Sequence, residues 1–558
     1  MITRAQLIIQ FTRKNWLLVA ATLICAVLGA FLSVLLPLSI GKFYETALHE
    51  NSLKGRLFDM LPVVIETNRA YFLFLGVLVL AASIFLFTEK YLAGVIGEKF
   101  SRSIRELAFL SQLKQPLPVF NSKPTGKYLL RYSGDLIFIQ KFITSGIIEF
   151  SSDLIYIIFS SWALFTLSEG LTLIVFAFLL SGFLLIYFLT IKLKEIISLR
   201  RNSKSALLGF VAQRFQAFSS IKAFNREKPE EEQFNKRSKK VFDFGLKYFR
   251  NRSMIEALLP FIFYSAIGFV LYDVAIMREQ KPYGIKKADV FAYILILLYM
   301  QKSFRRVLKV NVLWRAGSVS YMKLLRVINR PFEMEKGAIG ELNATGKISF
   351  QNVSFSYEDG TKVIENFSEN ISENSIVHIT GNAGSGKSTL LKLVLNLFPP
   401  TSGEIFFNDF SGSKQISPKE IRRNVTIVSN DFPLIGNTIF KAISYSRAEE
   451  KRERALASLQ RLKFASVDED ENILDFKLTD YAGNLSAGER KMLMFSRAFL
   501  TQKRILLLDE PFDELDDNNR EVIAERLNNL RNRRTIIIAS SKPLPAELIP
   551  DKIISLSK

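Results

Sequence analysis

Cysteine and histidine are nearly absent from this chain of 558 residues. Cys25 is the single cysteine, and His49 and His378 are the only histidines. One cysteine cannot form an intramolecular disulfide, and it builds neither a cysteine-rich zinc site nor a disulfide-stapled secreted scaffold. Two histidines likewise exclude a three-histidine metal site. Several classes of metalloenzyme and secreted protein are therefore excluded.

The excess of positive charge has two interpretations. Lysine and arginine number 74 against 53 acidic residues, which gives a net charge of +21. Such an excess is typical of nucleic-acid binding, and also of the cytoplasmic loops of membrane proteins. The mean hydropathy of +0.17 and the 48 phenylalanines indicate membrane segments. The apolar runs described next favour the membrane interpretation, so we expect a lipid bilayer and no nucleic acid as partner.

Six apolar runs predict six membrane-spanning helices within a first domain at 1–330. The runs lie at 16–40, 71–87, 147–167, 171–193, 255–277 and 290–300, and the last is short unless extended on either side. The first run has no charged residue and is too long for the apolar core of a signal peptide, so we expect it to be retained. Only residues 168–170 separate the third and fourth runs, which predicts a tight helical hairpin.

Basic residues give the expected orientation of these spans. Arg4, Arg13 and Lys14 precede the first run, and many cations fill 90–131 and 192–252. By the positive-inside tendency, both termini are expected in the cytoplasm of a multi-pass plasma-membrane protein. Cations at 278–287 fall in a loop expected outside, which runs against that tendency.

Three carboxylates lie near the presumed membrane boundaries, namely Glu149, Asp153 and Glu256. Carboxylates inside a membrane line substrate or proton paths in some proteins. The alternative is that these three lie in cytosolic extensions of long helices and pair with the abundant lysines and arginines. Both interpretations stay open at this point.

The pattern changes after Arg330. A polar, glycine-bearing linker at 331–346 precedes a second domain at 347–558. Apolar, β-rich runs at 348–355, 376–380, 425–429, 505–508 and 535–539 alternate with helical patterns. This alternation predicts an α/β domain.

A glycine-rich stretch, GNAGSGKSTL at 381–390, follows one of these runs and leads into an apolar helical pattern. The full GxxxxGKS pattern between a strand and a helix predicts a phosphate-binding loop for ATP. Positive φ at Gly381, Gly384 and Gly386 would turn successive N–H groups toward phosphate oxygens. Lys387 would reach the β- and γ-phosphates, and the Ser388 hydroxyl would ligate Mg²⁺. The candidate nucleotide-binding residues here are Gly381, Asn382, Ala383, Gly384, Ser385, Gly386, Lys387, Ser388 and Thr389.

A second phosphate-linked motif is ILLLDEP at 505–511, an apolar run that ends in two acids. Asp509 is placed to hold Mg²⁺, directly or through water. Glu510 is placed to polarise the attacking water and is, with Lys387, a candidate catalytic residue.

The stretch NLSAGERKMLMFSRAFL at 484–500 resembles the signature region of ATP-binding cassette (ABC) proteins, in which LSAGE stands for the usual LSGGQ. The resemblance implies that the signature binds the γ-phosphate held by a second subunit, so two such domains are required. Tyr357, in VSFSYEDG, matches the aromatic residue that stacks on adenine. The implied signature residues are Leu485, Ser486, Ala487, Gly488 and Glu489.

The resemblance covers nearly the whole chain. Residues 116–135 and 215–234 are similar to cytoplasmic loops of exporter-type members, whose short coupling helices dock on the ATP-binding domains. The implied architecture is an α-helical membrane domain of six transmembrane helices followed by an α/β P-loop NTPase domain of the ABC type. Such a half-transporter works with a second one, as a homodimer or a heterodimer.

Two positions depart from the family pattern. Asn430 stands where the family has a glutamine that contacts Mg²⁺, and Ser540 or Ser541 stands where it has a histidine. Asparagine is one methylene shorter than glutamine, and serine lacks the cationic form of imidazole. Losing a positioned γ-phosphate donor costs about 10² to 10³ in rate, by analogy with oxyanion donors.

The expected function is ATP-driven export or flipping of a hydrophobic or amphipathic substrate across the cytoplasmic membrane by a dimer that uses ATP and Mg²⁺. Because the phosphate loop needs cytosolic ATP, six spans with both termini in the cytoplasm fit better than five. Two alternatives are a hydrolysis-poor half of a heterodimeric exporter and an ATP-binding membrane regulator. The identity of the substrate cannot be inferred from these residues.

Overall fold

The computed structural model describes residues 3–48, 67–121, 128, 131–276, 287–330, 332–333, 341–357, 359–412, 414–445, 451–464 and 472–556. The chain divides into two compact units. The first comprises Met1–Leu113 and Lys123–Arg330, and the second comprises Lys114–Ser122 and Pro331–Lys558. A short stretch of the helical half of the chain thus belongs to the second unit.

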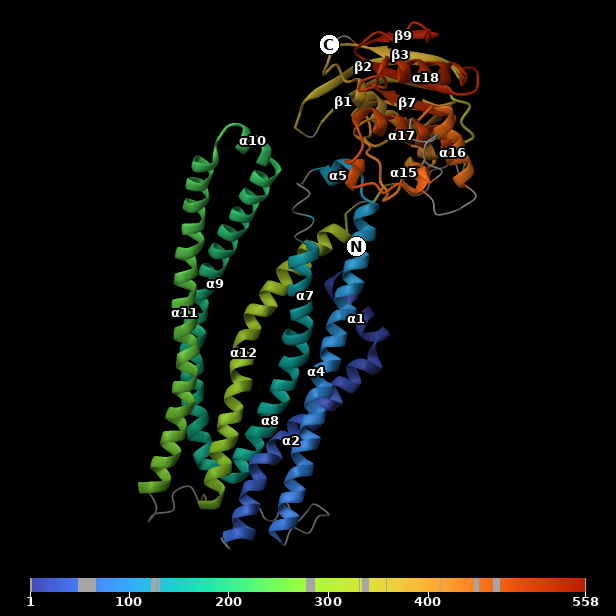
Figure 1. Cartoon of the computed structure of the whole chain (residues 1–558). Helices are drawn as coiled ribbons and strands as arrows, with labels where there is room; N and C mark the ends of the chain where they lie inside the picture. Colours follow the sequence, from blue (N-terminus) through green and yellow to red (C-terminus); the bar gives the residue numbers. More distant parts are fainter. Residues whose placement is uncertain are drawn as a thin grey trace. The chain divides into compact units, whose positions relative to one another are not determined.

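Long helices make up the first unit (Figure 1). In chain order they are α1 (Arg4–Lys14), α2 (Trp16–Leu48), α4 (Asn68–Leu113), α7 (Leu136–Ile143), α8 (Glu149–Leu167), α9 (Glu169–Gln216), α10 (Phe218–Ala223), α11 (Glu227–Ile276) and α12 (Lys287–Ile328). Two π-helical segments, Arg131–Asp135 and Thr144–Ile148, flank α7. In Figure 1, α9 and α11 run side by side over most of their length.

Five stretches of the described residues are long and apolar enough to cross a membrane. They are Trp16–Ile40, Asn68–Leu113, Leu136–Leu167, Glu169–Gln216 and Glu227–Ala275. They contain the first four expected runs and residues 255–275 of the fifth, whose last residue, 277, lies outside the described part of the chain. The expected sixth run at 290–300 lies in α12, which is not among the five. Charged residues lie close on both sides of this run, at 287 and 289 before it and at 302–309 after it. The count of six spans therefore stays a prediction.

Several helices extend far beyond the apolar runs that predicted them. α4, α9 and α11 have 46, 48 and 50 residues. Lysine, arginine and glutamate are good helix formers, so the change from apolar to charged residues does not end a helix. The expected hairpin at 168–170 is narrower than predicted, since only Ser168, with φ −161° and ψ 113°, leaves the helical conformation. Glu169 and Gly170 already belong to α9.

The second unit is an α/β domain with two sheets. An antiparallel sheet has the order β2-β1-β4-β5, and a parallel sheet has the order β6-β7-β8-β3-β9. The strands are β1 (Ile348–Ser356), β2 (Lys362–Ile371), β3 (Ile376–Thr380), β4 (Ser402–Phe407), β5 (Phe410–Ser411), β6 (Val425–Val428), β7 (Ile505–Asp509), β8 (Thr535–Ser540) and β9 (Lys552–Ser555). The helices are α5 (Leu117–Asn121), α13 (Lys387–Val394), α14 (Pro418–Asn424), α15 (Ile439–Ser444), α16 (Arg452–Arg461), α17 (Ala487–Leu500) and α18 (Asp517–Asn528).

The parallel sheet is the centre of this domain and positions the site. All six residues of β8 are buried, as are the first four of β7. Apolar side chains on one face pack with α17 and α18, and those on the other face pack with α13. Because parallel strands share a carboxyl edge, the residues that follow β3, β7 and β8 meet there. This edge holds the phosphate loop and both acids of the second motif.

One short helix from the helical half belongs to this domain. α5 lies in the expected loop 116–135, and Leu117 packs against the apolar cluster under α13. The Glu333 amide donates to the Lys114 carbonyl at 3.0 Å, and the Glu333 carboxylate pairs with Arg422 at 2.8 Å. The other expected loop, 215–234, contains α10 and remains with the helical unit. Residues 122–127 and 129–130 lie outside the described part of the chain.

Candidate nucleotide site

The phosphate loop joins β3 to α13. Gly384 has φ 80° and Gly386 has φ 97°, as the sequence predicts. The expected positive φ at Gly381 is wrong, since this residue is not among those with left-handed backbone. Gly381 is instead required because its backbone lies close to neighbouring atoms. A Cβ there would lie 2.6 Å from both the Leu556 carbonyl oxygen and Ser385 Oγ.

Lys387 lies at the start of α13 with its ammonium group folded over this loop. Its Nζ donates to the Gly381 carbonyl at 2.8 Å and to the Asn382 carbonyl at 3.0 Å. The same nitrogen is 3.9 Å from Glu510 Oε1, and the side chain is only 6% exposed. The structure thus brings the two candidate catalytic residues together.

Asp509 collects two hydroxyl groups at the end of β7. Ser388 Oγ donates to Asp509 Oδ1 at 2.9 Å, and Ser429 Oγ donates to Oδ2 at 3.1 Å. Burial raises the pKa of Asp509, while the two hydroxyl donors oppose that shift. Hydroxyl and carboxylate oxygens are the donors that Mg²⁺ prefers, so Ser388 and Asp509 fit the expected cation.

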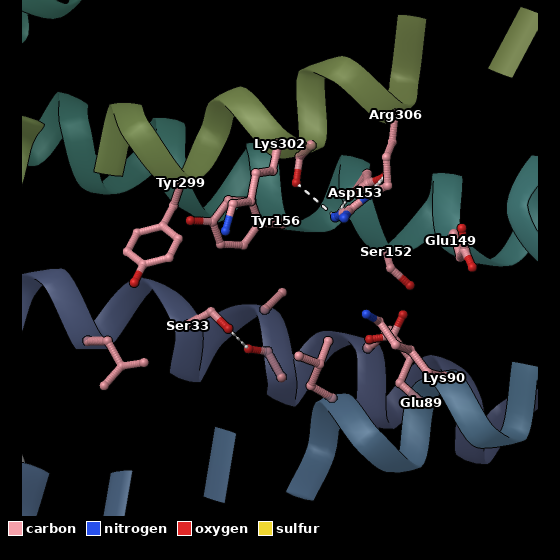
Figure 2. A pocket seen from close by; sticks show the side chains of 16 residues that line it. Ser33, Glu89, Lys90, Glu149, Ser152, Asp153, Tyr156, Tyr299, Lys302 and Arg306 are labelled. Carbon is pink, nitrogen blue, oxygen red and sulfur yellow. Dashed lines mark hydrogen bonds and ion pairs between the residues drawn. The ribbon is translucent and has the colours of Figure 1, made fainter. Parts of the chain in front are cut away.

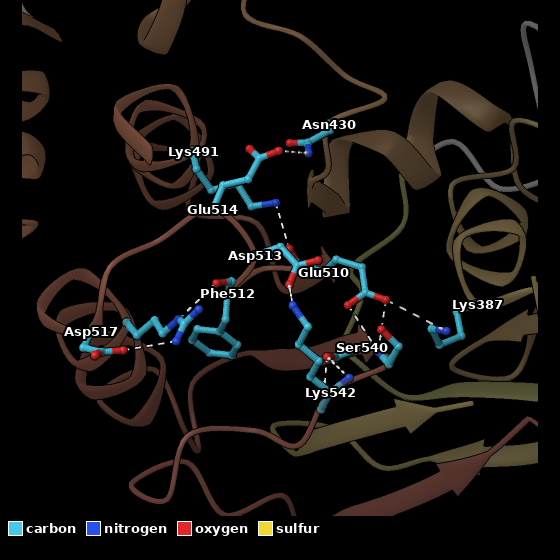
Figure 3. A network of polar contacts seen from close by, with 12 residues as sticks. Lys387, Asn430, Lys491, Glu510, Phe512, Asp513, Glu514, Asp517, Ser540 and Lys542 are labelled. Atoms are coloured by element: carbon cyan, nitrogen blue, oxygen red, sulfur yellow. Dashed lines mark hydrogen bonds and ion pairs between the residues drawn. The ribbon is translucent and has the colours of Figure 1, made fainter. Parts of the chain in front are cut away.

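Asn430, the third expected metal ligand, faces another residue. Its Nδ2 lies 3.5 Å from Glu514 Oε1 on the loop after β7 (Figure 3). The structure therefore places Asn430 beside the loop that precedes α18. Among the described residues no hydrogen bond joins Asn430 to Asp509, in keeping with the shorter reach of asparagine.

Glu510 is held from its backbone and its side chain. Its amide donates to the Ala539 carbonyl at 2.8 Å, and its carboxylate accepts the Ser541 amide at 3.0 and 3.2 Å. Its φ of 42° is left-handed, a conformation that costs a non-glycine residue about 1–2 kcal/mol. The surrounding hydrogen bonds keep the residue there, which is common where a side chain must point at a substrate.

Tyr357 is placed by aromatic packing. Its ring meets those of Phe355 and Phe398 edge-on, at centroid distances of 4.9 and 5.7 Å. Its hydroxyl lies 3.0 Å from Thr389 Oγ1, which ties it to the helix of the phosphate loop. These contacts fix the ring beside the phosphate loop, where the resemblance places the aromatic residue that stacks on adenine.

The signature residues begin α17. Ser486 is the N-cap, since its Oγ accepts the Glu489 amide at 3.2 Å. The Glu489 carboxylate in turn accepts the Ser486 amide at 2.7 Å, so the pair forms a capping box. Glu489 is therefore more than an added charge in the signature. Serine followed three residues later by glutamate was a signal for this pairing in the sequence.

Comparison with known proteins identifies both units. The family model for the ABC transporter transmembrane region matches residues 19–304, and the ABC transporter model matches residues 364–513. The chain belongs to the ABC transporter family. It is a multi-pass membrane protein with a cytoplasmic ATP-binding domain, and exporters of this kind work as dimers.

Relatives and a solved structure agree with this assignment. An "ATP-dependent lipid A-core flippase" of Pasteurella multocida (strain Pm70) is 24% identical over 461 residues, 82% of this chain and 78% of that protein. A protein of the same name from Neisseria gonorrhoeae (strain ATCC 700825 / FA 1090) is 25% identical over 84% of this chain and 75% of its own. The structure of a bacterial Atm1-family ABC exporter with ATP bound matches with a TM-score of 0.78 and 18% identity, covering 95% of this chain and 91% of that one.

Sequence reasoning missed Lys491 in this ABC domain. The side chain is 1% exposed, and its Nζ donates to the Glu510 carbonyl at 2.9 Å. Burial lowers the pKa of Lys491, while the neighbouring acids, Glu514 foremost, oppose the shift. The available signal was a lysine directly before the apolar run MLMF in a helix expected to pack on the sheet.

The position of the family histidine is filled differently here. Ser540 is 5% exposed, and its hydroxyl donates to the Lys542 carbonyl at 2.9 Å and accepts the Lys542 amide at 3.1 Å. The serine that reaches Glu510 is Ser541, through its backbone amide. A backbone donor leaves no mark in the sequence, which is why this contact was not predicted.

His378 lies next to this position in the parallel sheet. It sits on β3 opposite Ile538 of β8, two residues before the pair Thr380 and Ser540. The side chain is 7% exposed, and among the described residues its Nε2 has no hydrogen-bond partner. Burial lowers the pKa of His378, opposed by the Ser540 backbone and the Glu510 charge.

Proposed function

We propose that this chain is one half of a dimeric ATP-driven exporter that moves a hydrophobic or amphipathic, lipid-like substrate across the cytoplasmic membrane. The observation that carries the proposal is the meeting of Lys387, Asp509 and Glu510 at one edge of the parallel sheet. The names of the relatives, lipid A-core flippases, support a lipid-like substrate.

Each residue has a proposed part in ATP hydrolysis. Glu510 polarises the attacking water, and Lys387 offsets the negative charge of the β- and γ-phosphates. Ser388 and Asp509 would hold Mg²⁺, which neutralises phosphate charge when bound. Tyr357 stacks on adenine, and residues 485–489 of the second subunit complete the γ-phosphate side through the start of α17.

The test is reconstitution in liposomes with two readouts. Phosphate release and movement of a fluorescent lipid between leaflets are measured for the wild type and for Glu510→Gln. We expect ATP-dependent lipid movement that the variant loses together with phosphate release, while ATP binding persists. Lipid movement that is equal in both proteins, or independent of ATP, contradicts the proposal.

Asn430 and Ser540 favour a second candidate, a hydrolysis-poor half of a heterodimer or an ATP-binding regulator. The Asn430 amide faces Glu514, and the Ser540 hydroxyl is engaged by Lys542, so both family contacts to the γ-phosphate are weakened. In this case the purified chain binds ATP with little turnover. Asn430→Gln combined with Ser540→His should then raise phosphate release at least tenfold, whereas an unchanged rate argues against it.

A further inference from the structure

The helical unit contains a cavity lined by charged residues, to which the proposed function assigns no role. A cavity of about 460 Å³ lies among α2, α4, α8 and α12 (Figure 2). Three acids and three bases line it, together with apolar residues such as Ala30 and Leu86. The charged lining residues are Glu89, Lys90, Glu149, Asp153, Lys302 and Arg306.

One acid and one base of this cavity neutralise each other. Arg306 Nε donates to the two carboxylate oxygens of Asp153 at 2.8 and 3.0 Å. Asp153 is 2% exposed, and this paired geometry satisfies its charge. Glu256, outside the cavity, is likewise paired, with Arg252 at 3.1 Å and Lys309 at 3.3 Å. Two of the three carboxylates that the sequence left open are thus in ion pairs.

The other four charged residues, which are Glu89, Lys90, Glu149 and Lys302, form no such bidentate pair with any described residue. Glu89 is 8% exposed and lines the cavity beside Ser152 (Figure 2). Lys302 stacks over the Tyr299 ring at 5.7 Å. Within the described part of the chain, no ion pair within 4 Å joins Glu89 or Glu149 to Lys90 or Lys302, although the charges of Lys90 and Arg306 lie near enough to attract Glu89.

A buried carboxylate that lacks an ion-pair partner is costly, and a ligand cation removes that cost. Lys90 and Lys302 are exposed and offer ammonium groups to an anion. A ligand of one sign satisfies only half of this set and adds like-charge repulsion with the other half. A ligand that carries both signs satisfies the acids and the bases together.

We propose that this cavity binds the zwitterionic head group of an amphipathic substrate, with its ammonium group on Glu89 and its phosphate, or an equivalent anion, on Lys90 and Lys302. The proposal rests on the proposed export function, because it assigns the head-group class of the exported molecule. The apolar lining at Ala30 and Leu86 suits the adjoining acyl region.

The test compares three fluorescent short-chain lipids with identical acyl chains, binding to the full-length protein in a maltoside detergent without ATP. They are phosphatidylethanolamine, its N-acetylated form, which lacks the ammonium charge, and phosphatidylglycerol. We expect the wild type to prefer phosphatidylethanolamine by about tenfold, since one lost charge contact is worth about that factor. Equal affinity for the three lipids overturns the proposal.

Variants assign the two ends of the head group. Glu89→Gln should reduce the preference for phosphatidylethanolamine toward one, and Lys302→Gln should weaken all three phosphate lipids severalfold. Glu106→Gln, on the same helix but exposed and paired with Arg102, is the matched control and should keep the preference. A Glu89→Gln protein that binds ATP normally and keeps the preference overturns the assignment. If Glu89→Gln does not fold, Lys302→Gln alone decides, because unaltered affinity for all three lipids is equally contradictory.

One further measurement and a comparison of the two assays separate the sources of failure. Glycerophosphoethanolamine, which lacks acyl chains, should compete poorly with the fluorescent lipid. Full competition would point to a soluble zwitterionic ligand and overturn the proposal that the ligand is amphipathic. The binding assay needs no ATP turnover, so it can fail while Glu510-dependent lipid movement succeeds. In that case the export function stands and only the head-group class is wrong.

Discussion

The backbone amide of Ser541 donates to both carboxylate oxygens of Glu510, at 3.0 and 3.2 Å. The residue after β8 therefore orients the candidate general base at the end of β7 without using its own side chain. In the family a histidine side chain occupies this region, and here the neighbouring Ser540 turns its hydroxyl back onto Lys542.

Removing that amide should slow hydrolysis. Ser541→Pro deletes the donor, and we expect kcat to fall by about 10- to 100-fold with little change in KM for ATP, because ground-state contacts are retained. Ser541→Ala keeps the amide and is the control, with a rate close to that of the wild type. Phosphate release measured over a range of ATP concentrations gives kcat and KM for both variants. Equal rates for the two variants would show that the amide does not orient Glu510.

The phosphate loop should respond unequally to alanine at its two left-handed glycines. Gly386→Ala combines φ 97° with a Cβ placed 2.9 Å from Val363 Cγ1, whereas Gly384→Ala, at φ 80°, meets open space. We expect Gly386→Ala to weaken ATP binding more than tenfold. Gly384→Ala should cost only the strain of about 1 kcal/mol or somewhat more, a loss of about tenfold or less. Titration with a fluorescent ATP analogue checks the order, and the reverse order would contradict this geometry.

Glu489 should matter for stability through the start of α17. Glu489→Ala removes one half of the capping box and should cost about 0.5–2 kcal/mol, seen as a lower midpoint of thermal unfolding. Glu489→Gln keeps an acceptor of the same length, and glutamine is also found in capping boxes, so its midpoint should stay near that of the wild type. If the midpoints of both variants fall by the same amount below that of the wild type, the charge of Glu489 and not the capping box provides the stability.

His378 should make the folded protein sensitive to acid. Its pKa in the folded state lies below the ordinary 6.5, so the unfolded chain binds more protons between these two values. Its contribution to stability is complete above about pH 6.5 and is lost as pH falls through the range below that value. Unfolding midpoints from pH 8 to pH 5 should fall less steeply for His378→Gln than for the wild type. A slope in His378→Gln equal to that of the wild type would refute the burial effect.

The elements that could be predicted are those buried on both faces or marked by special backbone. β7 and β8 are continuous apolar runs because helices cover both sides of the parallel sheet, and Gly384 and Gly386 mark left-handed positions. β2, KVIENFSENI, was missed because half of its residues are polar and exposed in the antiparallel sheet.

The sequence predicted only those parts of the site in which the identity of a side chain within a motif indicates its role. Lys387, Ser388, Asp509 and Glu510 are recognisable by motif, and the structure brings them together. The Ser541 amide has no residue identity to recognise, and the sequence marks Lys491 only by the apolar run MLMF that follows it. Three-dimensional pairing is also what decides Asp153, whose partner Arg306 lies 153 residues away.

The length of α11 has a mechanical consequence. Its 50 residues, with Pro260 as an internal proline, span about 75 Å at 1.5 Å per residue, more than twice the roughly 30 Å of a bilayer core. A helix of that length packed along α9 acts as a lever, and a tilt of about 10° displaces its far end by roughly 13 Å. Small rearrangements at one end thus become large strokes at the other, and Pro260, which lacks an amide hydrogen, marks where such a lever would bend first.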